Sequence, residues 1–278
     1  MGVAPSISRE FAFEHSSATL NSHDTAKLRI VTLKKTLQMN SSQPPNPQPT
    51  EPPFAVPGGW SERSIELNGR TLQISVPANS DVFLDAGTET GTVKKSDDTP
   101  TWPYLWPAAL EMARVVPSLL EHVPSSARAV ELGCGIGLVG LSAAHSGAQV
   151  TFTDYEQDAV QLAAHNARRN GFSNAVGKVL DWNKPPDQSY PVILACDVLY
   201  ETKNHEPLLQ LIDSMLAADG VCWIGEPGRI NAERFVEFCK KNLAERNLQL
   251  NIRNASGSDL EEFQLHKFQI LEITRSRN

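Results

Sequence analysis

From residue 127 onward, short apolar runs alternate with longer segments whose apolar residues recur every three or four positions. The short runs predict buried strands, and the longer amphipathic segments predict helices. This alternation predicts a doubly wound α/β domain, in which a mostly parallel sheet carries helices on both faces. Strands are expected at 127–132, 149–154, 176–180, 191–197 and 221–225, and helices at 137–146, 156–170, 205–218 and 231–246.

Two further apolar runs close the chain, at 248–253 and 264–274. No helical pattern separates them, so we expect an antiparallel pair of strands at one edge of the sheet. The resulting Rossmann-like sheet would have seven strands. In such sheets the ligand lies beyond the carboxyl ends of the strands, where the strand order reverses.

The residues before this domain follow different patterns. Residues 40–58 are rich in proline, serine, glutamine and asparagine, a composition that buries too little apolar surface to fold. Residues 64–76 alternate apolar and polar positions around Asn68-Gly69, which predicts a β-hairpin. The chain therefore divides into a disordered segment with a proline-rich linker, a hairpin extension and the α/β domain, at 1–58, 59–100 and 101–278.

Composition narrows the possible partners. The chain has 278 residues and a formal net charge of −7, which gives no electrostatic reason to bind nucleic acid. No apolar run approaches the roughly 20 residues that span a bilayer, so no membrane partner is expected. The four dispersed cysteines favour free thiols in a reducing cytoplasm. We expect no metal site and a monomer. His145 and His165 lie within expected helices and are interpreted as surface or packing residues and not as ligands.

Three glycines at alternate positions follow the first expected strand, in Gly133-Cys134-Gly135-Ile136-Gly137. Such a turn brings backbone N–H groups close to a ligand, because glycine lacks a Cβ. The spacing through Gly140 also fits a dinucleotide-binding loop, whereas Glu131 before the loop can hold an ammonium-bearing ligand. Asp154 ends the next strand, where an acid binds ribose in either type of loop or caps the following helix.

The segment Glu131-Leu132-Gly133-Cys134-Gly135-Ile136-Gly137 resembles motif I of the class I, seven-strand S-adenosylmethionine methyltransferases. The resemblance implies that the glycine loop approaches the methionine and ribose parts of the cofactor and that Asp154 binds the ribose hydroxyls. It also implies that Asp181 accepts a hydrogen bond from the adenine amino group and that Trp182 packs on the adenine ring.

The fourth expected strand ends in Asp197-Val198-Leu199-Tyr200. A carboxylate at the end of a core strand is costly to bury without a partner, and a substrate cation is a natural one. The Asp-x-x-Tyr spacing resembles the lysine-directed branch of these enzymes, which implies that Asp197 and Tyr200 are catalytic. DNA, RNA and glutamine-amide methyltransferases usually carry two prolines there, which this chain lacks. A helix cap beside a core tyrosine is the alternative. We place Cys196 with the cofactor-binding residues.

Further segments resemble the same branch. Trp102-Pro103-Tyr104-Leu105-Trp106-Pro107 is similar to its aromatic entry segment, which implies that Trp106 borders the cofactor. Glu226-Pro227-Gly228-Arg229 resembles the Asp-Pro-Gly-Arg of the electron-transfer-flavoprotein lysine methyltransferase group, with glutamate in place of aspartate. The hairpin at 64–76 resembles that of bacterial relatives of this group.

These motifs together predict an S-adenosylmethionine-dependent N-methyltransferase that acts on lysine side chains of a protein substrate. Three alternatives stay open. The first is methyl transfer to a small amine or heterocycle. The second is an NAD-dependent oxidoreductase, although no catalytic set for hydride transfer stands out. The third is a non-catalytic module that uses the fold to bind a partner.

Overall fold

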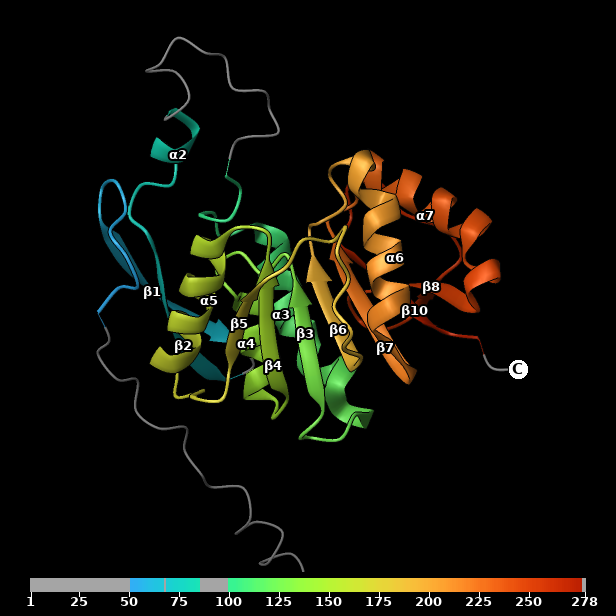
Figure 1. The fold of residues 1–278 in the computed structure, drawn as a ribbon, viewed down its shortest axis with the longest axis horizontal. Helices are drawn as coiled ribbons and strands as arrows, with labels where there is room; N and C mark the ends of the chain where they lie inside the picture. The colour runs from blue at the N-terminus through green and yellow to red at the C-terminus, as the bar shows by residue number, and fades with distance from the viewer. Residues whose placement is uncertain (1–50, 68, 86–99, 277–278) are drawn as a thin grey trace, which may run out of the picture. The chain divides into compact units, whose positions relative to one another are not determined.

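The computed structural model describes residues 51–67, 69–85 and 100–276. An eight-stranded sheet in the order β5-β4-β3-β6-β7-β10-β8-β9 forms its centre (Figure 1). The predicted α/β fold is confirmed, and the eighth strand is the two-residue β9, which no sequence pattern indicates. The strands are β3 (Arg128–Leu132), β4 (Gln149–Asp154), β5 (Val176–Val179), β6 (Tyr190–Cys196), β7 (Leu216–Glu226), β8 (Leu248–Asn254), β9 (Asp259–Leu260) and β10 (Gln269–Arg275).

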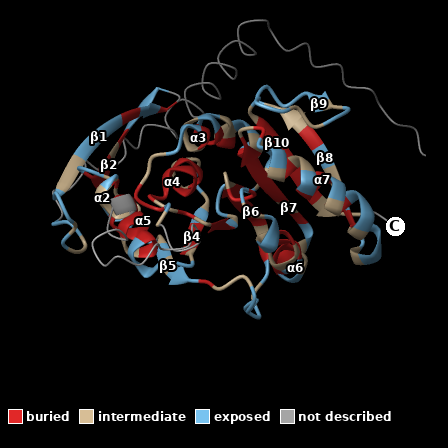
Figure 2. Cartoon of the chain, turned by 90° about the horizontal axis from the view of Figure 1, so that it is seen from above, coloured by how far each residue is buried: buried red, intermediate tan, exposed pale blue. Residues whose placement is uncertain are grey.

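Helices cover both faces of the sheet (Figure 2). Three helices and the N-terminal hairpin share one hydrophobic core with one face, and two helices share a second core with the other face. The first three are α3 (Pro107–Leu119), α4 (Leu138–His145) and α5 (Gln157–Arg169), and the other two are α6 (His205–Met215) and α7 (Ile230–Asn242). Shorter turns of helix are α2 (Val82–Asp85), Leu120–His122, Thr202–Asn204 and Ala244–Arg246.

The central strands are apolar throughout because both of their faces are buried. In β6, Val192 and Leu194 belong to the core under α3, α4 and α5, whereas Ile193 and Ala195 belong to the core under α6 and α7. All four side chains are fully buried. This explains why the sequence shows a continuous apolar run at this strand instead of an alternating one.

The strand order reverses between β3 and β6. Strand β3 pairs in parallel with β4 on one side and with β6 on the other, and the helices that follow β3 and β6 cover opposite faces of the sheet. The loops after these two strands therefore diverge and leave space at the carboxyl edge. The predicted antiparallel C-terminal pair is also confirmed, with β10 inserted between β7 and β8.

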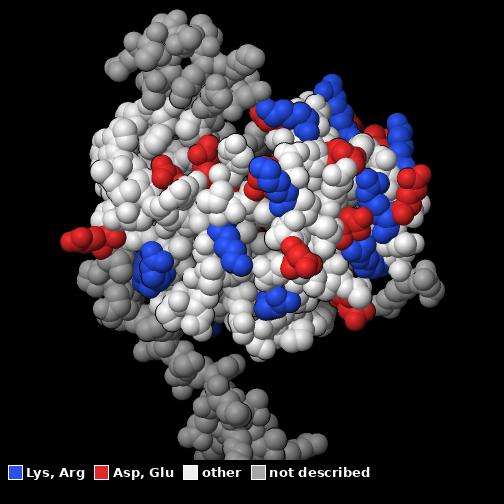
Figure 3. Space-filling model, viewed as in Figure 1, with Lys and Arg blue, Asp and Glu red and all other residues white. Residues whose placement is uncertain are grey.

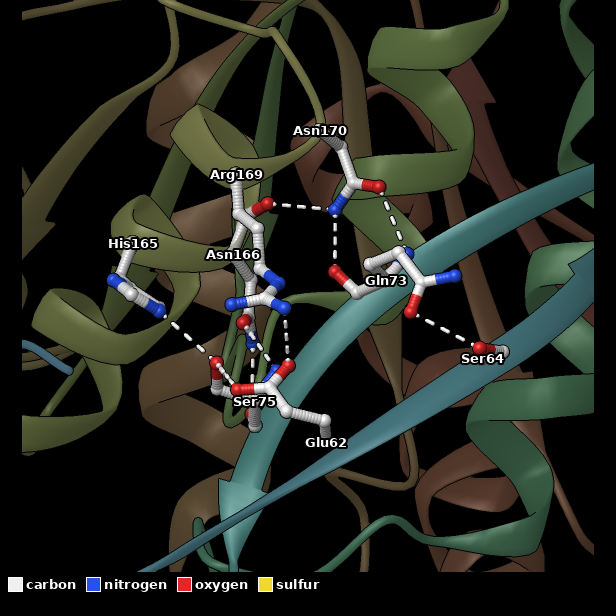
Figure 4. A network of polar contacts seen from close by, with 8 residues as sticks. All are labelled: Glu62, Ser64, Gln73, Ser75, His165, Asn166, Arg169 and Asn170. Carbon is white, nitrogen blue, oxygen red and sulfur yellow. Dashed lines mark hydrogen bonds and ion pairs between the residues drawn. The ribbon is translucent and has the colours of Figure 1, made fainter. Parts of the chain in front are cut away.

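The hairpin of β1 (Trp60–Leu67) and β2 (Arg70–Pro77) is longer than expected and packs beside α5 (Figure 4). Asn166 accepts a hydrogen bond from the Ser75 N–H at 2.8 Å and donates to the Ser75 carbonyl at 3.2 Å. Asn170 makes the same two contacts with the backbone of Gln73, at 2.9 and 2.7 Å. Two asparagine side chains thus occupy backbone groups of β2 in the way a neighbouring strand would.

This docking works because the helix and strand repeats match. Four residues of an α-helix rise about 6 Å, and two residues of a strand advance about 6.8 Å. Asn166 and Asn170 therefore face the backbone of Ser75 and Gln73 in register. Satisfying a strand edge in this way also protects it from pairing with other chains.

Ionisable side chains surround these amides (Figure 4). Arg169 forms an ion pair with Glu62 at 2.8 Å, and a ring nitrogen of His165 lies 3.0 Å from the Ser75 hydroxyl. Burial lowers the pKa of His165 to about 4, so the ring is neutral at pH 7. The expectation that this histidine packs within a helix is confirmed, since it is buried on α5.

The predicted linker is wrong in its last residues. Phe54 and Val56 pack against the hydrophobic core, and the Trp60 indole donates to the Phe54 carbonyl at 2.8 Å. A buried Trp102 contacts the same phenylalanine edge to face. The free energy gained by packing these aromatic side chains together orders a segment whose polar composition predicted disorder. Residues 1–50, Asn68 of the expected turn and residues 86–99 lie outside the described residues.

Replacing Asn166 with alanine is expected to destabilise the protein by about 2–4 kcal/mol, because the N–H and C=O of buried Ser75 lose their partners. Urea unfolding followed by circular dichroism measures the change. Asn174→Ala, in an exposed loop, is the matched control and should change stability by less than about 0.5 kcal/mol. Equal effects of the two substitutions would contradict the docking role.

Candidate active site

A cavity of about 490 Å³ lies among the loops that follow β3, β4, β5, β6 and β7. Of the twelve site residues predicted from the sequence, eleven line this cavity and Gly137 does not. The structure therefore brings together residues from five separate segments of the chain, while the role of each residue stays a prediction. The eleven are Trp106, Glu131, Gly133, Cys134, Gly135, Asp154, Asp181, Trp182, Cys196, Asp197 and Tyr200.

Gly137 and Gly140 serve packing. A Cβ on Gly137, which has φ +87°, would lie 2.7 Å from the Cβ of Ala163 on α5. A Cβ on Gly140 would lie 2.5 Å from a carboxylate oxygen of Glu131. The spacing that suggested a dinucleotide loop thus has a structural cause, because the chain approaches α5 closely at Gly137 and the sheet closely at Gly140.

Glu131 is buried at the end of β3 and also lines the cavity. Its Oε2 accepts a hydrogen bond from the Gly140 N–H at 3.0 Å. Burial raises the pKa of Glu131 to about 8, and the nearby charge of Asp154 adds to this effect. A cation bound in the cavity would oppose the shift by stabilising the ionised carboxylate.

Asp154 connects the glycine loop to β4. Its Oδ2 accepts from the Gly135 N–H at 3.0 Å, and its Oδ1 accepts from the Glu156 N–H at 3.1 Å. Burial raises the pKa of this carboxyl. The alternative that Asp154 is a helix cap is wrong, because the N-cap of α5 is Glu156.

Asp181 and Trp182 lie after β5, on the rim of the cavity. The Asp181 carboxylate accepts from the backbone and side-chain amides of Asn183, at 3.0 and 3.1 Å, and these bonds lower its pKa. Trp182 reaches over the glycine loop, since a Cβ on Gly133 would lie 3.8 Å from its ring. An aromatic side chain and a hydrogen-bond acceptor therefore lie next to each other on the cavity lining.

Asp197 has a left-handed backbone conformation, with φ +55°, and its N–H donates to the Gly225 carbonyl at 2.8 Å. Its carboxylate receives two bonds from Arg229, from Nε to Oδ1 at 2.6 Å and from Nη2 to Oδ2 at 2.8 Å. The alternative of a helix cap is wrong, because α6 begins at His205 with Asn204 as its N-cap. The sequence alone predicts no role for Arg229, although this residue ends the motif Glu226-Pro227-Gly228-Arg229.

Tyr200 is 40 % exposed and is therefore not a core tyrosine. Its hydroxyl lies 3.5 Å from that of Thr101, and burial of the phenol raises its pKa. The Trp106 indole donates to the Thr101 carbonyl at 3.0 Å. The aromatic entry segment thus lines the cavity, and Thr101 links Trp106 of this segment to Tyr200 of the loop after β6.

Negative charge dominates the cavity. Six acidic residues and two basic residues line it, which favours a cationic ligand such as a sulfonium or an ammonium group. On the outer face shown in Figure 3, by contrast, acidic and basic side chains are interspersed. The acidic lining residues are Glu131, Asp154, Glu156, Asp181, Asp197 and Glu201, and the basic ones are Lys203 and Arg229.

Comparison with known proteins identifies relatives of this chain. A family model described as lysine methyltransferase matches residues 102–242, the part that holds the glycine loop and the cavity-lining strand ends. Protein N-lysine methyltransferase METTL21A of Xenopus tropicalis is 36% identical over 143 residues, or 49% of this chain. Protein-lysine N-methyltransferase EFM2 of Saccharomyces cerevisiae is 26% identical over 72% of this chain.

Histone-arginine methyltransferase METTL23 of Xenopus laevis is a third relative, 30% identical over 63% of this chain and 80% of its own length. The match spans 66% of METTL21A and 54% of EFM2, so the chain covers between about half and two thirds of those two proteins. The methyltransferase family predicted from the motifs is confirmed. The dinucleotide oxidoreductase has no support among these relatives.

Glu131→Gln is expected to make the stability of the ligand-free protein less dependent on pH. The folded pKa of Glu131, about 8, is above its ordinary value of 4.5, so its contribution is complete below pH 4.5 and is lost as pH rises through 8. Relative to the wild type, the variant should gain stability between pH 5 and pH 8.5, by up to a few kcal/mol in order of magnitude.

Urea unfolding at a series of pH values measures this trend. Glu245→Gln changes an exposed glutamate and is the matched control, for which no such gain is expected. A stability difference between wild type and Glu131→Gln that is constant over this pH range would contradict the raised pKa.

Proposed function

This chain belongs to the lysine methyltransferase family, and from that premise we propose that it transfers a methyl group from S-adenosylmethionine to the side-chain nitrogen of a lysine in a protein. The observation that carries the proposal is the shared cavity. It brings the glycine loop and the acid at the end of β4 together with Asp197 and Tyr200.

S-adenosylmethionine is the cofactor of this family, and the cavity residues suit it. It supplies a methyl group on a positively charged sulfur and becomes a neutral thioether. The glycine loop and Asp154 would hold its amino-acid and ribose parts, with Glu131 near its ammonium group. Asp181 and Trp182 would receive the adenine. The excess of carboxylates along the cavity supports a ligand with a net positive charge, and the sulfonium and ammonium groups of S-adenosylmethionine outweigh its one carboxylate.

Asp197 would orient the substrate nitrogen. Its carboxylate is held at the end of β6 with only 6% of the side chain exposed, so little water competes for its lone pairs. It can accept a hydrogen bond from the amine and stabilise the positive charge that develops on nitrogen. Tyr200 adds an aromatic face and a hydroxyl, both suited to a nearby cation. Alignment and desolvation would supply most of the rate.

The identity of the substrate is the finer part of the proposal. Two of the compared relatives are named for lysine and one for histone arginine, so the modified amino acid needs a direct test.

We also propose a monomer in the cytoplasm. The free thiols of all four cysteines fit a reducing compartment, and among the described residues no helix could cross a bilayer.

Incubating the purified chain and methyl-labelled S-adenosylmethionine with a cell lysate is expected to label a protein band. Acid hydrolysis of that band followed by chromatography should release methylated lysine. Recovery of methylarginine or methylhistidine would assign a different target residue. Label confined to small molecules would support the small-amine alternative and contradict a protein substrate.

Asp197→Asn is expected to lower methyl transfer by about 100-fold or more, because the neutral amide cannot stabilise charge on the amine. Asparagine tolerates a positive φ, so the backbone and the cofactor site should persist. The thermal shift produced by S-adenosylhomocysteine should therefore match that of the wild type.

Asp187→Asn is the control for this substitution, at an exposed aspartate in the loop before β6. It should retain transfer and the thermal shift. Near-normal turnover by Asp197→Asn would remove Asp197 from the chemistry.

A further inference from the structure

The strongest contact of the Asp197 carboxylate is with another part of the chain. Arg229 binds both of its oxygens, at 2.6 and 2.8 Å, in a bidentate ion pair. Such pairs are among the stronger polar contacts in proteins, and their geometry is specific. The residue that would orient the substrate amine is thus already paired with a permanent cation.

Backbone hydrogen bonds hold both partners of this pair in place. The Asp197 N–H donates to the Gly225 carbonyl, as described above. Arg229 is the N-cap of α7, and its N–H and that of Gly228 donate to Oε1 of buried Glu226, at 2.9 and 3.1 Å. The Gly228 carbonyl accepts from the His266 N–H at 2.9 Å, which ties the turn to the segment before β10. The fixed turn therefore holds the base of the Arg229 side chain beside Asp197.

The chemistry requires a neutral nucleophile. A lysine side chain has an ordinary pKa of about 10.4 and enters as an ammonium ion without a free lone pair. A nearby uncompensated carboxylate raises the pKa of such a group by about 1–3 units. An isolated Asp197 would therefore bind lysine tightly in its unreactive form.

We propose that Arg229 is a positioning residue that neutralises Asp197, so that the site accepts lysine as a free amine and does not trap it as an ammonium ion. The proposal rests on the proposed lysine methylation. Each oxygen of Asp197 keeps lone pairs that Arg229 does not use. The amine can therefore still be oriented by the carboxylate while the pair as a whole carries no net charge.

Acidic residues outnumber basic ones around the pair, although burial raises the pKa of Glu131 to about 8 and that of Glu226 to about 7, so these two are partly protonated at neutral pH. Glu131 and Asp154 stand at the ends of β3 and β4, and Glu226 lies at the end of β7. The loop after β6 contributes Tyr200, Glu201 and Lys203, with Lys203 paired to Glu201 at 3.1 Å. Acidic groups thus surround Asp197, and the Arg229 guanidinium is the cation that contacts its carboxylate directly.

The reaction then balances as follows. The ammonium ion of the substrate gives one proton to water. The freed lone pair of nitrogen forms the bond to the methyl carbon while the carbon–sulfur bond breaks and its electron pair stays on sulfur. The product is a methylammonium ion, which regains the positive charge that the sulfur loses.

Arg229→Met tests the proposal through the pH dependence of kcat. In this variant the Asp197 carboxylate has no cationic partner, so the acid limb of the kcat profile should shift to higher pH by about one unit or more. The KM for the lysine substrate should fall at pH 7. Arg229→Lys keeps the charge and should leave the limb close to that of the wild type. An unmoved limb in Arg229→Met, or equal shifts in both variants, would overturn the proposal.

Two controls separate charge from folding. Arg168→Met removes an exposed arginine of α5 and should leave the profile unchanged. Arg229→Gln provides a second neutral variant if the methionine variant does not fold, as judged by its thermal shift with S-adenosylhomocysteine. Its acid limb should also move upward, and an unmoved limb would count against the proposal.

A binding measurement without turnover separates this proposal from the proposed function. The probe is Nα-acetyl-lysine amide, titrated by NMR into protein saturated with S-adenosylhomocysteine at pH 7. Arg229→Met should bind it about tenfold more tightly than the wild type does, and the double variant Asp197→Asn/Arg229→Met should lose that gain. Equal binding by wild type and Arg229→Met would overturn the role of Arg229, whether or not the wild type methylates lysine.

Discussion

Buried and half-buried carboxylates at the ends of neighbouring strands are the constraint on which the site depends. Parallel strands bring their carboxyl ends to one edge, so Glu131, Asp154, Asp197 and Glu226 stand at the ends of β3, β4, β6 and β7. Each is costly to remove from water without partners. The first two bind N–H groups of the glycine loop and of α4, and the others bind Arg229. The need to satisfy these charges sets the shape of the loops.

The hairpin is connected to the same edge. Asn166 donates from one amide nitrogen to the Ser75 carbonyl and to the carbonyl of Ile136 in the glycine loop, at 3.2 and 3.0 Å. One buried side chain thus holds both the N-terminal extension and the loop that would receive the cofactor. The extension is in this sense part of the methyltransferase domain, because an amide that stabilises one element also positions the other.

The cavity combines two opposing electrostatic requirements. A surplus of carboxylates attracts a cationic cofactor and a cationic substrate, but transfer needs the substrate nitrogen in its neutral form. Pairing one carboxylate with a guanidinium meets both requirements, since an arginine stays charged at any relevant pH. The charge of the cavity can then remain negative while the point of reaction is close to neutral.

The sequence by itself determined the fold and most of the lining of the site. Strand–helix alternation and strand-end motifs are local signals, and parallel pairing necessarily gathers such ends at one edge. Tertiary structure decided what these residues contact. The pairing of Asp197 with Arg229 joins two loops, the packing role of Gly140 depends on Glu131, and the order of Phe54 comes from aromatic neighbours. Contacts between distant segments leave no periodicity in the sequence, because they depend on how the strands are ordered in the sheet.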